Sequence, residues 1–152
     1  MKTLYYDDFD VGDRFPTYGR TITEGEIAAF CSFVGYHAPL FIDEEYARQT
    51  PFGGRIAPHS LIMSVSTGMT ESLFRYNMVG LIAVERGRFL IPLRAGDTIR
   101  TDVVVIDKKP SRKADRGIVK FRDQVHNQRG ELIFEIDKIT LIKRVASTGE
   151  QA

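Results

Sequence analysis

The hydrophobic pattern of the chain changes about half way along, from a helical period to an alternating one. In the first half, apolar residues recur every three to four positions on one helical face, at Ile27, Phe30 and Val34. Thr23 and Glu26 have the spacing of a capping box, which marks the start of a helix. Gly35 is placed to end the same helix in a left-handed conformation. The pattern therefore predicts a helix between Thr23 and Gly35.

A second, longer helix is expected at about 59–76, because Pro58 suits the first turn of a helix and the helical period continues beyond it. Serine, threonine and glycine separate its apolar residues, so this helix has little bulk on any side. Such a helix suits a position enclosed by a curved sheet. Between the two helices we expect a loop over YHAPLF, a short helical turn that begins at Asp43, and a break at the Gly53-Gly54 pair.

From position 79 onward the pattern indicates strands, since Val, Ile and Phe are frequent and apolar residues partly alternate with polar ones. The predicted strands are 80–91, 98–108, 117–126 and 131–144. In the second of them, Ile99, Val103 and Val105 share one face. A hairpin turn is expected at 127–130, where a glycine is available for a positive φ.

Helices followed by successive strands favour an α+β fold with an antiparallel sheet. Four or five strands around one small-residue helix is the outline of a hotdog fold. We therefore expect one domain over 1–152, in which 1–18 is an extended arm and 146–152 is a frayed tail.

The composition of the chain favours a one-domain globular protein and gives no support to several other classes. A chain of 152 residues, 43% hydrophobic, has enough apolar material for one core. The formal charge of +1 gives no electrostatic case for nucleic acid or an anionic membrane, and no apolar run is long enough to span a bilayer. One cysteine and a start, MKTLYYDDFD, without signal-peptide character favour a cytoplasmic protein. Three scattered histidines and no cysteine cluster predict neither a metal site nor a bound cofactor.

The segment 30–63 is where we expect the functional site. It contains two of the 3 histidines, three of the 6 prolines and the Gly-Gly pair, and it lies between the two predicted helices. Loops framed by rigid elements are common places for binding and chemistry.

Four stretches of the sequence carry a resemblance to a known family. They are YYDDFDVGDRF, FCSFVGYHAPLFIDEEYARQTPFGGRIAPHSL, ERGRFLIPLRAGDTIRTDVVV and SRKADRGIVKFRDQVHNQRGELIFE. Together they resemble the MaoC-like dehydratase family, which includes the (R)-specific enoyl-CoA hydratases. The resemblance implies a hotdog fold, a homodimer or higher homo-oligomer, and an acyl-CoA-type thioester bound at the subunit interface beside the central helix.

The family places a catalytic aspartate just after the glycine that ends the first helix, and a histidine five residues later. In this chain those positions hold Tyr36 and Phe41. The resemblance keeps Pro39, a helix-capping Asp43 and His59, and it puts Ser60 where the family has glycine. The binding part of the site is therefore expected to persist, with Phe41, Pro39 and Ser60 against the substrate, while the proton-transfer part has changed.

Alternatives stay open for each catalytic candidate. Tyr36 either donates a hydrogen bond to a ligand carbonyl or fills the space of the aspartate, and Phe41 transfers no proton and closes the pocket. His37 has a suitable ordinary pKa, yet it needs a local turn to face the same pocket, so a surface role competes with catalysis. His59 either transfers a proton or fixes the loop at the helix start. Backbone N–H groups near Ser60 favour a developing oxyanion in both cases.

The segment KKPSRKADRG, at 108–117, is expected to be a basic loop. Its Arg112 and Lys113 are candidates for contact with the phosphates of coenzyme A. A charge run in a loop that is only solvated is the competing interpretation.

Three functions follow from these observations. The first is hydration of an enoyl-CoA or dehydration of a 3-hydroxyacyl-CoA with an altered active site. The second is a non-catalytic subunit that binds acyl thioesters or supports a partner that carries the aspartate and histidine. A thioesterase ranks below both, because Glu71, the carboxylate on the predicted central helix, lies about 18 Å along the axis from His59.

Overall fold

The computed structural model describes residues 2–145, so the predicted tail at 146–152 lies outside the described residues. Six strands form one antiparallel sheet in the order β1-β4-β5-β6-β3, with β2 paired to β4. The elements in chain order are η1 (Tyr6–Asp8), β1 (Arg14–Pro16), β2 (Arg20–Thr21), α1 (Glu24–Val34), α2 (Pro39–Ile42), α3 (Glu44–Arg48), α4 (His59–Met69), α5 (Glu71–Phe74), β3 (Met78–Phe89), β4 (Thr98–Pro110), β5 (Arg116–His126) and β6 (Leu132–Lys143). This order confirms the predicted α+β class.

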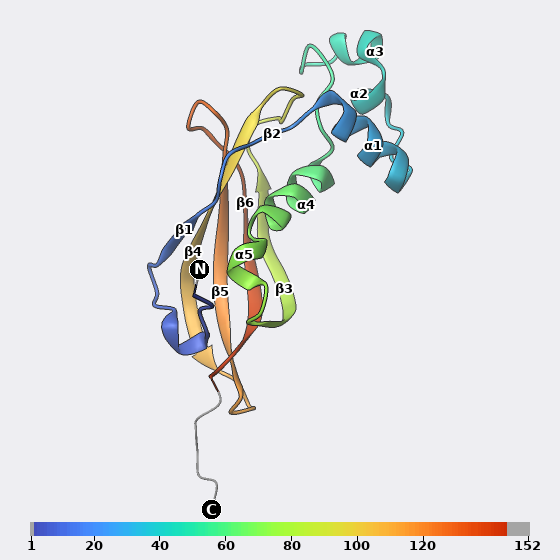
Figure 1. Cartoon of the computed structure of the whole chain (residues 1–152). Coiled ribbons are helices and arrows are strands. Elements are labelled where there is room, and N and C mark those ends of the chain that lie inside the picture. Colours follow the sequence, from blue (N-terminus) through green and yellow to red (C-terminus); the bar gives the residue numbers. More distant parts are fainter. Residues whose placement is uncertain (1, 146–152) are drawn as a thin grey trace, which may run out of the picture.

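The long strands pair in sequence, while α4 and α5 lie against one face of the curved sheet (Figure 1). Each predicted strand is present and begins and ends within two residues of its expected bounds. In β4 the inward face carries Ile99, Val103 and Val105, all buried, as the alternation predicted. Gly130 turns the β5–β6 hairpin with a φ of 74°.

The predicted start and end of α1 are confirmed. The Thr23 hydroxyl accepts from the Glu26 amide, and the Glu26 carboxylate accepts from the Thr23 amide at 2.8 Å. Gly35 ends the helix with a φ of 70°. The buried face consists of Ile27 and Cys31, whereas Val34, expected on that face, is exposed.

The prediction of one helix over 59–76 is wrong, because α4 ends at Met69 and a separate turn, α5, follows. At Thr70 both the backbone N–H and the hydroxyl donate to the Thr67 carbonyl, at 3.1 and 2.7 Å. This tight closure, with ψ near 4°, turns the chain. Pro58 precedes the helix as its N-cap and does not lie in its first turn.

Within the described residues 2–18, the predicted extended arm contains a short helix and packs against the sheet. Its short helix η1 and its strand β1 bring Tyr6 and Phe9 into the core, where the Phe9 and Phe121 rings lie 5.3 Å apart. Gly117 permits this packing, since a Cβ at that position would lie 2.2 Å from the Tyr6 ring. Aromatic burial therefore outweighs the polar composition of the segment.

Two predicted loops contain regular structure. The YHAPLF segment includes α2, which begins at Pro39 and closes where the Asp43 amide donates to the Pro39 carbonyl at 2.9 Å. Half of the expected basic loop at 108–117 is strand, since β4 continues to Pro110 and pairs there with Gly117 of β5. Only 111–115 lies outside the two strands.

The core has two parts. The larger lies between the sheet and the helices α1, α2 and α4, and the smaller lies between η1 and the strands β4 and β5. The helices α1, α2 and α3 gather at one end of the sheet, beside the start of α4 (Figure 1). Within residues 2–145, no helix is long and apolar enough to cross a bilayer.

Candidate functional site

An aromatic cluster forms at the start of α4. The Tyr36 ring lies 4.9 Å from the Phe41 ring and 6.1 Å from the His59 ring, each edge to face. The His59 ring lies 5.5 Å from Phe89 at the end of β3. We call Tyr36, Phe41, His59 and Phe89 the aromatic cluster. It joins three segments that are distant in sequence, and it contains three of the predicted site residues.

Local structure positions each ring. The left-handed turn at Gly35 lets the Tyr36 amide donate to the Cys31 carbonyl at 2.9 Å, which directs the chain back toward α4. Phe41 is buried in α2. The Asp43 side chain accepts from the Tyr46 amide at 3.0 Å and so caps α3, as the resemblance predicted.

Arginine side chains hold the helices α1 to α3 in place beside α4. Arg55 pairs with Glu44 at 2.7 Å and with Glu24 at 2.5 Å. The hydrogen bond from Arg55 holds the pKa of Glu44 below its ordinary value. Arg94 donates to the carbonyls of Phe52 and Arg55 at 2.5 and 3.4 Å. Sequence reasoning missed these arginines, because a single basic residue in a loop carries no local signal of its partner.

An apolar cavity of about 330 Å³ adjoins the aromatic cluster. Phe41, His59 and Phe89 line it together with Phe52 and Ile91. The first backbone N–H groups of α4 have no partner within the helix and carry the positive end of its dipole, so the start of α4 favours a carbonyl oxygen that gains negative charge. The arrangement is suited to binding an apolar group that ends in a carbonyl.

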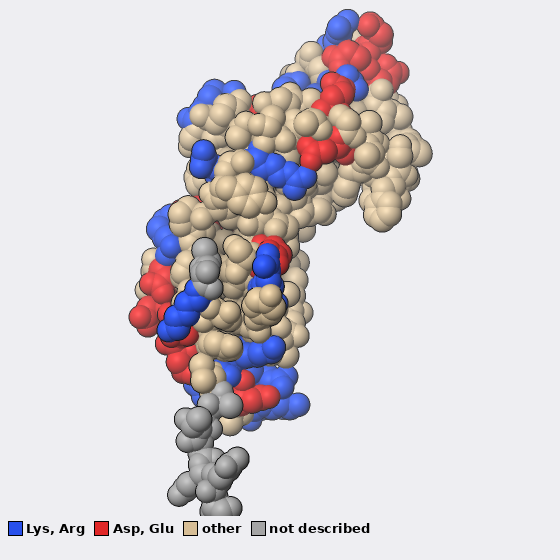
Figure 2. All heavy atoms as spheres, in the orientation of Figure 1, with Lys and Arg blue, Asp and Glu red and all other residues tan. Residues whose placement is uncertain are grey.

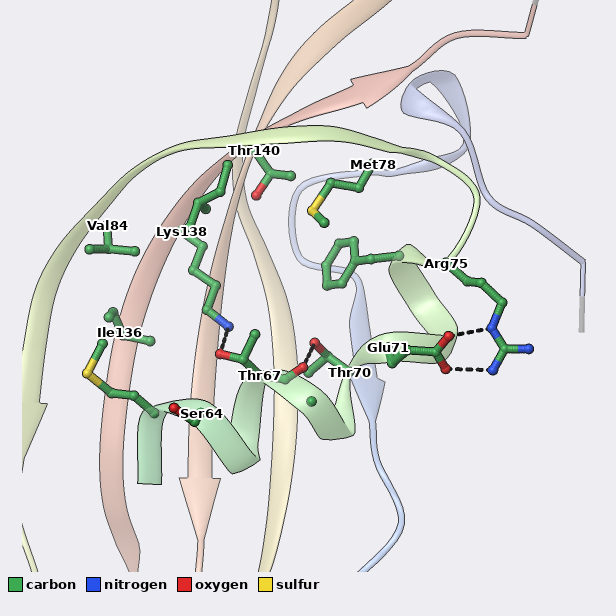
Figure 3. A pocket seen from close by; sticks show the side chains of 14 residues that line it. Ser64, Thr67, Thr70, Glu71, Arg75, Met78, Val84, Ile136, Lys138 and Thr140 are labelled. Atoms are coloured by element: carbon green, nitrogen blue, oxygen red, sulfur yellow. Dashed lines mark hydrogen bonds and ion pairs between the residues drawn. The ribbon is translucent and has the colours of Figure 1, made fainter. Parts of the chain in front are cut away.

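A second, larger cavity of about 680 Å³ lies further along α4, between that helix, α5, β3 and β6 (Figure 3). Its walls are formed mainly by apolar and hydroxyl side chains, and its charged residues are Glu71, Arg75 and Lys138. In Figure 3, Lys138 reaches from β6 toward Thr67 of α4. The Lys138 ammonium donates to the Thr67 hydroxyl at 2.8 Å and to the Asp123 carboxylate. Burial raises the pKa of Asp123, and the charge of Lys138 opposes this rise.

Sequence reasoning missed Lys138 and Asp123, although a signal existed. Asp123 lies between Phe121 and Val125 on the inward face of β5, and Lys138 follows Ile136 on the inward face of β6. Opposite charges at inward positions of two predicted neighbouring strands indicate a buried pair.

The remaining predicted site residues lie at different distances from the cluster. His37 and Pro39 are exposed beside it, and Ser60 is half-buried in the first turn of α4. Arg112 and Lys113 are exposed in the β4–β5 turn, at the opposite end of the sheet from the start of α4 (Figure 1). Within one chain they are therefore not part of the same site.

Glu71 in α5 pairs with Arg75, which follows that helix, and Glu71 lines the larger cavity, away from the aromatic cluster. Among residues 2–145, no group of three or more His, Cys, Asp or Glu is arranged to hold a metal ion. Figure 2 shows basic and acidic residues interspersed over the visible face, without a broad surface of one sign.

Comparison with known proteins finds relatives across most of the chain. A family model described as "MaoC like domain" matches residues 9–126. A 3-hydroxybutyryl-CoA dehydratase from Methylorubrum extorquens is 29% identical over 119 residues, which cover 76% of this chain and 73% of the relative. The chain spans only 34% and 43% of the length of two longer relatives.

Solved structures agree in fold. A MaoC-like dehydratase from Rhodospirillum rubrum has a TM-score of 0.84 at 28% identity, covering 93% of this chain and 98% of that chain. A conserved hypothetical protein from Mycobacterium tuberculosis, described as having a double hotdog fold, has a TM-score of 0.84 at 22% identity and covers 99% of this chain and 47% of that chain. These likenesses confirm the predicted hotdog fold.

Proposed function

Because this chain belongs to the MaoC-like domain family, whose members include hydratases and dehydratases of CoA thioesters, we propose that it hydrates an enoyl-CoA or dehydrates a 3-hydroxyacyl-CoA. The observation that carries the proposal is the meeting of Tyr36, Phe41 and His59 at the start of α4. The thioester carbonyl would lie against the first N–H groups of α4, which stabilise negative charge on its oxygen.

The altered positions define the roles in this proposal. Hydration requires one group to take a proton from water and one to protonate the α-carbon. Phe41 supplies neither, and a phenol such as that of Tyr36, with an ordinary pKa of about 10, is a poor base. We therefore give proton transfer to His59, with His37 as the alternative, and give Tyr36 the donation of a hydrogen bond to the substrate. Phe41, Pro39 and Ser60 would contact the bound thioester.

A homodimer completes the proposed site. The edge strand β3 exposes large apolar residues, including Leu81 at 53% and Ile82 at 52%. An unpaired apolar edge is a place for pairing with another chain. A second copy on β3 would also be needed for Arg112 and Lys113 to reach the coenzyme A phosphates, since both lie far from His59 within one chain.

A specific observation favours a second candidate, a non-catalytic subunit. Two positions of the aromatic cluster, Tyr36 and Phe41, are those where the family resemblance expects an aspartate and a histidine. The site would then bind acyl thioesters, or would support a hotdog partner that carries the catalytic pair.

The purified chain, incubated with crotonyl-CoA and with longer enoyl-CoA thioesters, separates these functions. Loss of the conjugated enoyl absorbance, abolished by His59→Ala, is the expected result. Calorimetric binding of saturated acyl-CoA without any turnover would instead support the non-catalytic subunit. If CoA thioesters neither bind nor react with the folded protein, the proposed reaction and the thioester-binding form of the second candidate are both wrong.

A further inference from the structure

The larger cavity contains a buried cation in a place where an alkyl chain would need only apolar walls. The Lys138 side chain is 11% exposed, and Asp123, its ion-pair partner, is 0% exposed. Thr67 accepts the other recorded hydrogen bond of the Lys138 ammonium. An ammonium has three N–H groups, and no protein acceptor is recorded for the third among residues 2–145.

The larger cavity begins at Met63, one turn of α4 beyond His59 of the aromatic cluster. His59, Met63 and Thr67 follow one another at four-residue spacing on the same face of α4. Strand β6 lies across from this face of α4. Its Phe134 stacks on Phe89 of the aromatic cluster. Ile136 and Lys138 come next on the same face of β6 and line the larger cavity. A ligand carbonyl at His59 would therefore direct its chain first past apolar side chains and then to Lys138.

The charge of Lys138 is already balanced. Its ammonium contacts the Asp123 carboxylate, so the pair brings no excess positive charge to the cavity. A buried carboxylate from a ligand would need such a charge, whereas a neutral oxygen needs only a donor. A methyl group at the same place would leave the third N–H of the ammonium desolvated and without an acceptor.

We propose that the larger cavity receives the distal part of the acyl chain, and that Lys138 with Thr67 selects chains that carry a hydroxyl or ketone oxygen there. This inference rests on the proposed function, because the thioester must lie at the start of α4. Thr67 comes eight positions after His59, which is about 12 Å along the helix. An extended alkyl chain with C–C bonds of about 1.5 Å advances about 1.3 Å per bond, so about nine bonds span this distance and the oxygen belongs on about carbon 8 or 9.

Calorimetry on the full chain with three unreactive ligands tests this inference. The ligands are octanoyl-CoA, 8-hydroxyoctanoyl-CoA and octanedioyl-CoA, which end in a methyl, a hydroxyl and a carboxylate. We expect the hydroxy thioester to bind about tenfold tighter than octanoyl-CoA, as for one hydrogen bond to a charged donor. We expect octanedioyl-CoA to bind more weakly than the hydroxy thioester.

Variants connect the preference to the named residues. Lys138→Met alone leaves Asp123 unpaired and endangers folding, so the double variant Asp123→Leu/Lys138→Met removes the pair together. It should lose the tenfold preference, and Thr67→Val should lessen it. Lys109→Met, which removes an exposed lysine of β4, is the matched control and should keep it.

The outcomes distinguish failure of the selection by Lys138 from failure of the proposed function. If octanoyl-CoA binds as tightly as the hydroxy thioester, or octanedioyl-CoA binds tightest, the inference is wrong while the proposed function stands. An unchanged preference in the folded double variant also overturns it. If none of the three thioesters binds, the proposed function fails and this inference fails with it.

Discussion

Lys138 in β6 and Asp123 in β5 form an ion pair beneath α4, and the Asp123 side chain is completely buried. Asp123 lies opposite Ile136 in the β5–β6 register, so Lys138 is its diagonal neighbour on the same face of the sheet. The second carboxylate oxygen of Asp123 has no hydrogen-bond partner within the described residues. Lys138 is therefore the recorded partner on which the buried carboxylate depends.

Removing one member of this pair should cost far more stability than removing both. We expect Lys138→Met to lower the free energy of unfolding by about 3–5 kcal/mol, because Asp123 is then buried without a counter-charge. The double variant Asp123→Leu/Lys138→Met should lie close to the wild type, since apolar groups replace both charges. Urea unfolding at pH 7 measures each value. Equal losses in the single and double variants would contradict the dependence of Asp123 on Lys138.

The sequence predicted the strands well and the site only in part. Because one face of each strand is buried, apolar and polar residues alternate along it, as at Ile99 and Val103. The bounds of the strands can be predicted from this alternation. The break of the central helix at Thr70 was missed, because threonine is tolerated in helices and its bonds to the Thr67 carbonyl depend on the fold. Burial of the first residues was missed for a similar reason, since Tyr6 packs on Gly117, 111 positions away (117 − 6).

At the site, the resemblance predicted the meeting of Tyr36, Phe41 and His59, but the predicted Arg112 and Lys113 lie at the other end of the sheet and the larger cavity was not foreseen. Tyr36, Phe41 and His59 lie together as expected of one motif. Lys138 and Asp123 come from two strands, so no local motif joins them, although each lies at an inward position of its strand. Their pairing depends on strand register, which the sequence constrains only through the hydrophobic faces.

Gly35 should tolerate alanine poorly, whereas Gly25 in the same helix should gain from it. Gly35 has a φ of 70°, where a Cβ is strained even though no atom lies within 4 Å of its position. Gly35→Ala should therefore lower stability by about 1 kcal/mol. Gly25→Ala, also without close contacts, should raise it by a few tenths to about 1 kcal/mol. Thermal unfolding followed by circular dichroism measures both, and a shift of the same sign would refute the role of Gly35 as a left-handed cap.

The capping box of α1 should make the free energy of unfolding depend on pH in the acid range. Hydrogen bonds from the Thr23 amide and from Arg20 lower the pKa of Glu26 from its ordinary value of 4.5. A lowered folded-state pKa stabilises the protein above pH 4.5, and this contribution is lost as the pH falls through the folded-state pKa. Glu26→Gln should cost about 0.5–1 kcal/mol at pH 7, a modest value because the side chain is partly exposed.

Urea unfolding of the wild type and of Glu26→Gln at several pH values measures this dependence. The two curves of stability against pH should converge below the folded-state pKa of Glu26. Glu45→Gln changes an exposed residue of α3 and is the control. Its curve of stability against pH should run parallel to that of the wild type. A constant difference between the wild type and Glu26→Gln down to strong acid would show that the carboxylate charge is not involved.

The apolar edge strand β3 should be the surface on which two copies meet. Ile82→Lys places a charge on this edge, so we expect the dimer to become a monomer in light scattering coupled to size exclusion. Val11 is an apolar residue that is 62% exposed near β1, the strand at the other edge of the sheet. Val11→Lys should therefore leave the dimer intact. A wild-type chain that is monomeric at micromolar concentration would refute the dimer.

Placing at positions 36 and 41 the aspartate and histidine that the family resemblance expects there should increase hydratase activity. The rings of Tyr36 and Phe41 lie 4.9 Å apart, so Tyr36→Asp and Phe41→His together put a carboxylate and an imidazole next to one another beside His59. A positioned acid–base group contributes about 10²–10⁴-fold to rate, and we expect crotonyl-CoA hydration to rise at least about tenfold after losses from imperfect placement. Some stability should be lost, because Phe41 is buried.

A matched polar control separates proton transfer from the mere opening of the pocket. Tyr36→Asn/Phe41→Gln makes the same positions polar and smaller without a group that titrates near neutral pH. Its rate should stay at that of the wild type, while the rate of the Asp/His variant should follow the ionisation of an imidazole as pH rises. If both double variants are folded, bind acyl-CoA and hydrate crotonyl-CoA no faster than the wild type, the geometry around Tyr36 and Phe41 does not support the family's reaction. The non-catalytic subunit would then be the better account of this chain, since binding would persist where added acid–base groups do not act.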